Sequence, residues 1–176
     1  MIVKLFRFIA LVLLLAPFAA FPQNTGNSGN EYDLKALFIF NFIKYVDWPQ
    51  AIEAADFKVG VLGQYEILES LRKVSDQKKI NNRKIEVEVF VDPDDINCQL
   101  LFIPRTMSDR LPECINKFSG KGVLIVTEGK NLATRGSSIN FVMVENKMKF
   151  EINQNAVHKA GLKLSSQLLN LALVVK

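Results

Sequence analysis

Three short, nearly all-apolar runs recur in this chain, and they limit its fold more than any other feature. They span residues 57–62 (FKVGVL), 98–103 (CQLLFI) and 123–127 (VLIVT). A strand that is buried on both faces is apolar along its length, whereas a strand with one solvent-exposed face alternates apolar and polar side chains. Segments with helical spacing of apolar residues separate the runs, at 65–74 and 108–118. Strands that alternate with helices in this way predict parallel pairing in a layered α/β domain.

Further strand patterns complete the predicted sheet. Residues 84–91 (KIEVEVFV) alternate apolar and charged side chains, which predicts a half-exposed strand near an edge. Residues 138–144 and 147–152 read as two strands joined in a hairpin at Glu145-Asn146. Val174-Val175 reads either as a final strand or as the end of the last helix. Together these patterns predict an α/β three-layer sandwich, in which a mostly parallel mixed sheet with a C-terminal β-hairpin carries helices on both faces.

The segment at residues 31–49 is the longest periodic stretch after the N-terminus, and it contains the only Trp of the chain. As a helix it is apolar over most of its circumference, so we expect it to be buried on more than one side, by the sheet and by a partner chain or other helices. Pro49 is expected to end it, because a residue before proline is disfavoured in the α region. Lys35 stands alone opposite a narrow polar stripe made of Asp33, Asn41, Lys44 and Asp47.

The first residues carry the pattern of an export signal. Lys4 and Arg7 form a positively charged start, residues 8–15 are an unbroken apolar run, and small residues follow. This pattern is typical of a secretory signal peptide, which we place at residues 1–22. An uncleaved membrane anchor is the alternative, but the apolar run is shorter than the roughly 20 residues that a spanning helix needs. We therefore expect an exported protein with no membrane span of its own after cleavage.

The rest of the chain reads as one domain behind a short linker. Residues 23–30 (QNTGNSGN) are polar and rich in Gly, Ser and Asn, which predicts a flexible linker. Residues 31–176 then form a single domain, long enough for one core. Removing Lys4 and Arg7 from the 22 basic residues leaves 20 against 18 acidic ones. A charge so close to balance gives no argument for nucleic-acid binding.

No catalytic or metal-binding constellation is evident in the sequence. His158 is the only histidine, and it has no nucleophile in a recognisable setting beside it. One His with Cys98 and Cys114 at a 16-residue spacing matches no zinc pattern. The carboxylates at residues 92–95 flank a proline in a turn, where solvation is the simpler reading than calcium binding. We therefore expect a protein that is not an enzyme and holds no metal or other cofactor.

One generic ligand site follows from the predicted sheet. In open α/β sheets, ligands bind beyond the carboxyl ends of the strands. Three of these ends lie at Gly63, Arg105 and Thr127. Helix N-termini at such an edge attract anions, with Arg105 as the counter-charge. Gly63, Arg105 and Thr127 are therefore the ligand-binding residues that the fold predicts.

The two cysteines leave two states open. Cys98 begins a predicted strand, and Cys114 lies on the helix that follows it. With a rise of about 3.3 Å per strand residue and about 1.5 Å per helix residue, the returning helix has not reached the level of Cys98 by residue 114. Export to an oxidising compartment favours a Cys98–Cys114 disulfide. Two free, buried thiols are a comparable reading.

Six stretches of the chain resemble the YfiR-like family of periplasmic proteins, in the same order and spacing. They cover essentially the whole predicted domain. The most specific are the segment that ends at Trp48-Pro49 and the C-terminal motifs KFEIN and AGLKLSSQLLNLA. The six stretches are YDLKALFIFNFIKYVDWP, FKVGVLG, CQLLFIP, KGVLIVTEG, INFVMVENKMKFEIN and AGLKLSSQLLNLA.

This resemblance implies a function and a set of contact residues. It implies a periplasmic, non-enzymatic signalling regulator, acting as a homodimer, that binds and restrains an inner-membrane sensor through the sensor's periplasmic domain. The sensor is of diguanylate cyclase or sensor-kinase type, so that release of a cyclase raises cyclic di-GMP and favours biofilm. Partner or ligand contacts are implied at Glu151, Val157, Lys163 and Ser165, which match the C-terminal motifs. A periplasmic small-ligand-binding module that uses the strand-end loops is the alternative function.

The chain departs from the YfiR-like pattern at its cysteines. The cysteine that opens the CQLLFI strand is kept as Cys98, but its usual mate in the preceding strand is replaced by Gly60. A second cysteine pair of the family is absent, because residues 131–140 hold no cysteine. Redox control of the family type is therefore not expected here, and Cys114 is the one other cysteine with which Cys98 can pair.

Overall fold

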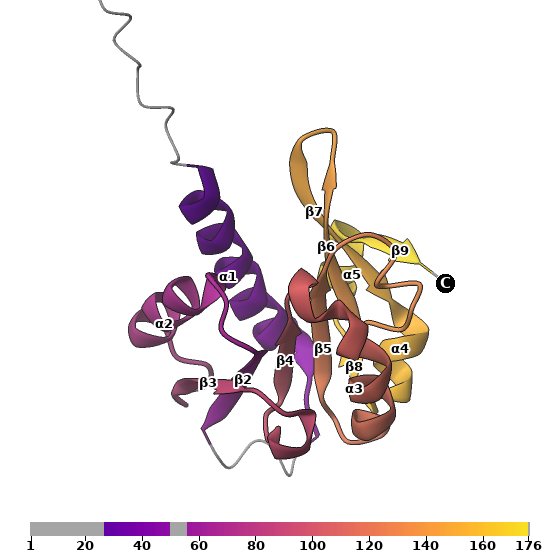
Figure 1. Cartoon of the computed structure of the whole chain (residues 1–176), viewed down its shortest axis with the longest axis horizontal. Helices are drawn as coiled ribbons and strands as arrows, with labels where there is room; N and C mark the ends of the chain where they lie inside the picture. Colours follow the sequence, from indigo (N-terminus) through magenta and orange to yellow (C-terminus); the bar gives the residue numbers. More distant parts are fainter. Residues whose placement is uncertain (1–26, 50–55, 176) are drawn as a thin grey trace, which may run out of the picture.

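A seven-stranded mixed sheet forms the centre of the molecule (Figure 1). The computed structural model describes residues 27–49 and 56–175, so the predicted signal peptide at residues 1–22 lies outside the described residues. The strand order is β3-β2-β4-β5-β6-β7-β9, and a separate two-stranded sheet pairs β1 with β8. The strands are β1 (Val46–Asp47), β2 (Phe57–Leu62), β3 (Ile85–Phe90), β4 (Leu100–Ile103), β5 (Leu124–Glu128), β6 (Ile139–Val144), β7 (Lys147–Asn153), β8 (Lys163–Leu164) and β9 (Leu173–Val175).

Helices cover both faces of this sheet, which confirms the predicted α/β fold. Every neighbouring pair in the sheet is parallel except β6 and β7, which form the expected antiparallel hairpin. Glu145 and Asn146 at its turn have φ values of 50° and 59°, as a two-residue turn with two left-handed positions requires. The helices are α1 (Asn27–Tyr45), α2 (Ile67–Gln77), α3 (Leu111–Phe118), α4 (Gln154–Lys159) and α5 (Ser166–Leu171), with 3-10 helices η2 (Pro93–Asp95) and η3 (Arg105–Arg110).

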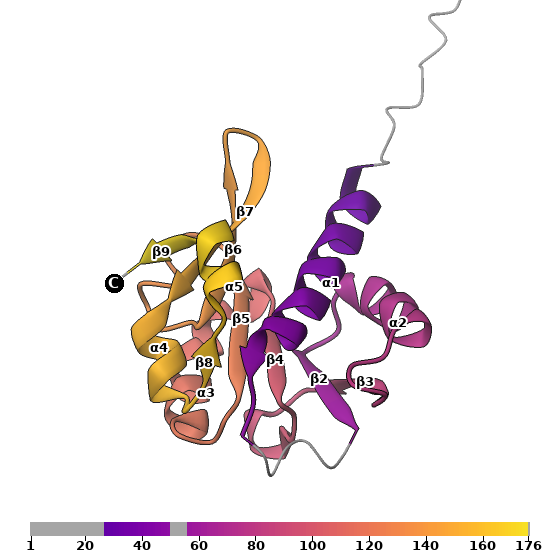
Figure 2. The ribbon, with the colours of Figure 1, turned by 180° about the vertical axis from the view of Figure 1, so that it is seen from behind.

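Alternate side chains of each central strand enter two different apolar clusters. In β4, Leu100 and Phe102 face the cluster under α1 and α2, whereas Leu101 and Ile103 face the cluster under α3. Successive strand residues point to opposite faces, so a fully apolar strand must be covered twice. Figure 2 shows α1, α4 and α5 together on the face that α3 does not cover. The continuous apolar runs in the sequence therefore reflect the three layers.

Helix α1 differs from its predicted bounds at both ends. It begins at Asn27, so the last four residues of the predicted linker are helical. It ends at Tyr45, before Trp48-Pro49, because the backbone then pairs with β8 as a short strand. The amide of Ser165 donates to the Tyr45 carbonyl (3.0 Å), which gives the helix end a partner. The Trp48 indole donates to the Ile43 carbonyl (2.8 Å) and packs on Phe57.

Side chains cap the starts of α4 and α5 but not that of α3. The side chain of Asn153 accepts from the amide of Ala156 at the start of α4, and Ser165 accepts from Leu168 at the start of α5. Neither Ser108 nor Asp109 caps α3, because η3 occupies residues 105–110 and α3 begins only at Leu111. Pro112 in the first turn of α3 fits this start, since proline has no amide to satisfy there. The end of the chain is the strand β9, the first of the two readings of Val174-Val175.

Burial of Phe42 is expected to dominate the contribution of α1 to stability. Phe42 is fully buried, with ring centroids 5.7 Å from Phe141 and 5.1 Å from Phe150 on the hairpin strands. Phe42→Ala should lower the free energy of unfolding by about 3–5 kcal/mol in urea denaturation. Leu37→Ala on the 41% exposed face of the same helix should change it by about 0.5 kcal/mol or less. An equal decrease in the free energy of unfolding for both variants would contradict the placement of α1 on the sheet.

Candidate functional site

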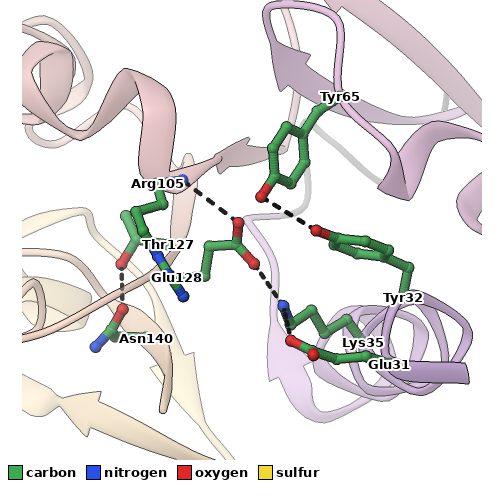
Figure 3. Close-up of polar contacts among 8 residues, drawn as sticks. All are labelled: Glu31, Tyr32, Lys35, Tyr65, Arg105, Thr127, Glu128 and Asn140. Atoms are coloured by element: carbon green, nitrogen blue, oxygen red, sulfur yellow. Dashed lines mark hydrogen bonds and ion pairs between the residues drawn. The ribbon is translucent and has the colours of Figure 1, made fainter. Parts of the chain in front are cut away.

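A buried ion pair joins α1 to the carboxyl end of β5. The Lys35 ammonium lies 2.5 Å from the Glu128 carboxylate and 2.6 Å from that of Glu31, one turn earlier on α1 (Figure 3). Lys35 is 4% exposed and Glu128 is 2% exposed. The backbone amide of Arg105 also donates to Glu128, at 3.4 Å. Burial lowers the pKa of Lys35, but hydrogen bonds to Glu128 and Glu31 outweigh it, so the pKa lies above its ordinary value.

Two tyrosines close one side of this ion pair. The Tyr32 hydroxyl lies 3.2 Å from the Tyr65 hydroxyl, and their rings meet edge to face. The Lys35 ammonium lies 4.8 Å from the centre of the Tyr32 ring, which adds a cation–π contact. Burial, together with the hydrogen bond to Glu128, raises the pKa of Tyr65 far above its ordinary value. Tyr65 is therefore a neutral hydrogen-bond donor, suited to holding a carboxylate in place.

A second polar chain runs beneath the ends of β5, β6 and β7. The Thr127 hydroxyl lies 2.9 Å from both the Ser137 hydroxyl and the Asn140 side-chain oxygen. The Asn140 amide group donates to the Gly129 carbonyl and to the Glu151 carboxylate, each at 2.8 Å. Buried polar groups that are all paired in this way fix the geometry of the segment that follows each strand.

An open cavity of about 590 Å³ lies at this end of the sheet. Arg105 and Lys130 contribute to its wall, and within residues 27–49 and 56–175 neither side chain forms an ion pair. The hairpin supplies an apolar wall that includes Met143 and Met148, and β9 adds Leu173. Six of the fourteen lining residues are charged, and they lie beside this apolar wall. A concave surface that combines apolar side chains with polar groups is typical of binding sites for small molecules or peptides.

The structure separates the three ligand-binding residues that the strand ends predicted. Arg105 lines the cavity as expected. Thr127 is fully buried, and its hydroxyl is used inside the polar chain described above. Gly63 lies outside the lining and packs near Met107. The Thr127 side chain points into a layer of the fold because successive strand residues point to opposite faces, and contacts of Gly63 and Thr127 with a ligand stay predictions.

The four residues implied as partner contacts lie in different settings. Glu151 lines the strand-end cavity. Val157 is 3% exposed in the core on α4, so its side chain packs inside the domain, and its contact with a partner stays a prediction. Lys163 is exposed on β8, opposite Asp47 of β1. The hydroxyl of Ser165 caps α5, which gives it a structural role.

The cysteines are free and buried, in the apolar cluster beneath α3. Burial raises the pKa of the Cys98 thiol to about 12 and that of Cys114 to about 11. Both thiols are therefore protonated and unreactive while the domain is folded. A disulfide between them stays a prediction. Gly60, at the family's cysteine position, lies beside Cys98, because a Cβ built on it falls 2.8 Å from the Cys98 sulfur.

Sequence reasoning missed the two residues on which this site is built. Lys35 was recognised only as the one cation opposite the polar stripe of its helix. The position of Lys35 on an apolar helix face could have indicated a buried ion pair, because a charge there needs a partner in the core. Glu128 belongs to the predicted strand end at residues 127–129, but a solvated carboxylate is common at such an end, so the sequence did not indicate its ion pair. Its partner is 93 residues away in the sequence.

Within residues 27–49 and 56–175, no group of three or more His, Cys, Asp and Glu side chains is arranged to hold a metal ion. Over the same ranges, no helix combines the length and the apolar character that crossing a membrane requires. His158 is exposed on α4, away from the ion pair of Lys35.

Comparison with known proteins gives one family and a general fold. A family model described as YfiR/HmsC-like matches residues 32–173. A crystal structure of a conserved domain protein from Vibrio cholerae has 10% identity and a TM-score of 0.56, covering 82% of this chain and 60% of that one. The ABC domain from Streptococcus pneumonia in complex with L-Trp has 11% identity and a TM-score of 0.49, and the match covers 68% of this chain and 55% of that one. This chain therefore spans less than two thirds of either. No curated protein matches it.

Removing one partner of the buried ion pair should destabilise the fold strongly, whereas removing both partners should destabilise it much less. Lys35→Met leaves the buried Glu128 carboxylate without its main counter-charge, so the free energy of unfolding should fall by about 3–5 kcal/mol. The double variant Lys35→Met, Glu128→Met should recover much of that loss in a double-mutant cycle. Lys44→Met, at an exposed lysine of the same helix, should change stability by about 0.5 kcal/mol or less. Additive losses in the cycle would contradict the pairing.

The contact between Gly60 and Cys98 allows a test by substitution. Gly60→Ala places its Cβ 2.8 Å from the Cys98 sulfur and 2.9 Å from a Phe90 ring carbon, so it should cost about 1–3 kcal/mol. Gly60→Cys should instead form a disulfide with Cys98 under oxidising conditions and regain stability, typically about 2–4 kcal/mol.

Mass spectrometry of the unreduced protein would identify that bond, and thermal unfolding with and without reductant would measure it. Gly60→Cys with Cys98→Ser is the matched control. Free thiols in oxidised Gly60→Cys would show that the two strands do not lie as described. The same spectra of the unsubstituted protein test the predicted Cys98–Cys114 bond.

Proposed function

The chain belongs to the YfiR/HmsC-like family, and on that premise we propose that it is a periplasmic, non-enzymatic regulator of diguanylate cyclase signalling. It binds the periplasmic domain of an inner-membrane sensor, of diguanylate cyclase or sensor-kinase type, and restrains it. Inhibition by binding requires that the regulator prefers one conformation of the sensor over another, because a ligand with equal affinity for both shifts no equilibrium. The family match over residues 32–173 carries this proposal.

Two exposed apolar side chains, Met143 and Leu173, line the strand-end cavity, and further ones lie on the elements around it, which supports a partner surface there. Seven large apolar side chains are exposed among the described residues, and six of them lie on α1, β6, α5 and β9. Figures 1 and 2 place the first turns of α1, the hairpin, α5 and β9 at the same end of the molecule. We call these side chains the end surface; they are Leu34, Leu37, Met143, Leu171, Leu173 and Val174. Exposed apolar side chains gathered at one end are characteristic of interaction sites.

Charged groups beside the end surface would give the contact its specificity. Arg105, Lys130 and Glu151 line the cavity between α1 and the hairpin. Interfaces commonly combine an apolar centre with a polar rim, and the rim selects the partner more than it adds affinity. Of the contacts implied by the family resemblance, Glu151 lies in this rim and Lys163 lies exposed on β8.

Two other occupants of the end surface are retained as alternatives. A second copy of this chain would form the homodimer that the resemblance implies. A small molecule in the 590 Å³ cavity would make the protein a ligand-binding module that uses the strand-end loops. The unpaired side chain of Arg105 is the observation that favours a ligand carrying a negative charge.

Substitutions on the end surface should abolish partner binding without unfolding the domain. We expect tagged protein lacking residues 1–22 to retain, from solubilised envelope membranes, a membrane protein with a cytoplasmic cyclase or kinase domain. Leu37→Glu with Leu173→Glu should reduce its recovery at least tenfold, and cellular cyclic di-GMP should rise. Val91→Glu is the matched control, because Val91 is an exposed apolar residue that follows β3, outside the end surface.

Equal recovery with all variants would contradict the end surface as the site. Recovery of no membrane signalling protein would contradict the regulator function. In that case, a change of sedimentation in the Leu37→Glu, Leu173→Glu variant would identify the homodimer as the occupant. A small molecule that raises the melting temperature only when Arg105 is intact would instead identify the ligand-binding module.

A further inference from the structure

We propose that a second cavity, between α3 and α4, binds a small organic anion. This cavity has a volume of about 410 Å³, within the range of small-molecule sites. Figure 1 shows α3 and α4 side by side, and two backbone hydrogen bonds join the loop that follows α3 to the end of α4: Gly120 donates to the Lys159 carbonyl and Gly122 to that of Ala160. The cavity shares no residue with the strand-end cavity, so the proposal does not rest on the proposed function.

The charges around this cavity are all positive. Arg135 and Lys159 belong to its wall, and no Asp or Glu does. Both cations are exposed, and neither forms an ion pair with any residue of 27–49 or 56–175. The strand-end cavity differs, because three carboxylates line it: Glu31, Glu128 and Glu151. Of the two cavities, the one beneath α3 and α4 therefore attracts anions without competition from its own acids.

A hydroxyl in the same wall is free to bind a ligand. Ser138 is 3% exposed and lines the cavity. Both backbone polar groups of Ser138 are hydrogen-bonded, since its amide donates to the Ile125 carbonyl and its carbonyl accepts from the amide of Asn153. No hydrogen bond of its hydroxyl is found in the described part of the chain, where every fully buried side-chain nitrogen or oxygen is paired, so this hydroxyl is the exposed part of the residue. The small exposed part of Ser138 thus offers a hydrogen bond to a bound molecule.

The walls are held in place before any ligand arrives. The loop at residues 131–138 is tied by backbone bonds from Arg135 to Asn131 and from Ser137 to Leu132. The Asn153 amide group donates to the Ala133 carbonyl (2.7 Å), which fixes the loop to the start of α4. A preorganised site binds more tightly, because little entropy is lost on ordering it.

The floor indicates what kind of anion fits. Phe118, Val123 and Ile125 are apolar and largely buried, and they line the same cavity as the two cations. Inorganic phosphate would leave this floor uncovered, whereas an anion with an aromatic or branched aliphatic body would cover it. The ligand class is therefore a small organic carboxylate or phosphate monoester, with its charged group toward Arg135 and Lys159.

Titration of the ¹⁵N-labelled protein, followed by ¹H–¹⁵N NMR, tests this site. We use phenylacetate and phenyl phosphate as probes, with the neutral isostere phenylacetamide and inorganic phosphate as controls. The two organic anions should shift the amides of Ser119, Gly136 and Ser138 saturably, and binding should weaken as salt is raised. Phenylacetamide and inorganic phosphate should bind at least fivefold more weakly.

Substitutions then assign the binding to the cavity. Arg135→Gln with Lys159→Gln should weaken phenylacetate binding at least tenfold, and Ser138→Ala should weaken it severalfold. Both cations are exposed, so the fold should persist, which the NMR spectrum itself verifies. Lys149→Gln, at an exposed lysine on β7, is the matched control and should bind as the unsubstituted protein does. Unchanged affinity in the Arg135 and Lys159 variant, or tighter binding of phenylacetamide than of phenylacetate, would overturn the proposal.

Discussion

The ion pair between Lys35 and Glu128 is the contact on which the functional end of this molecule depends. Both side chains are buried, so their charges are tolerable only together. Helix α1 lies across the sheet at one rotation about its axis, since any other would leave a buried ammonium without its acceptor. A purely apolar helix could slide or turn on an apolar sheet with little change in energy. The charges therefore add a register that the apolar side chains do not provide.

This rotation of α1 determines which of its side chains are exposed to solvent. With Lys35 turned toward β5, Ala36, Ile39 and Phe42 enter the core, and Leu34 and Leu37 remain exposed. Leu34 and Leu37 are thus exposed because Lys35 has to face Glu128. The core holds the cavity walls in position, and the exposed end of the sheet is left free to bind. Stability and recognition are divided between two faces of one helix.

Much of the fold could be predicted from the sequence, because its signals are local. The apolar runs of β2, β4 and β5 and the turn at Glu145-Asn146 each depend on a few neighbouring residues. The site could be predicted only in part, because it is assembled from distant segments. Arg105 was found from its place after a strand, but whether Thr127 points inward or outward depends on the layers around it. The end of α1 was missed because β8 decides it from across the sequence.

The small sheet of β1 and β8 also determines when the domain can be completed. Val46 pairs with Leu164, so the first helix is locked only by a segment near the other end of the chain. A nascent chain must therefore carry an apolar helix without its cover until more than a hundred further residues have been made. Contacts this distant in sequence slow folding, since a long loop must close before they form. Interrupted synthesis would leave this apolar helix without its cover, and uncovered apolar segments promote aggregation.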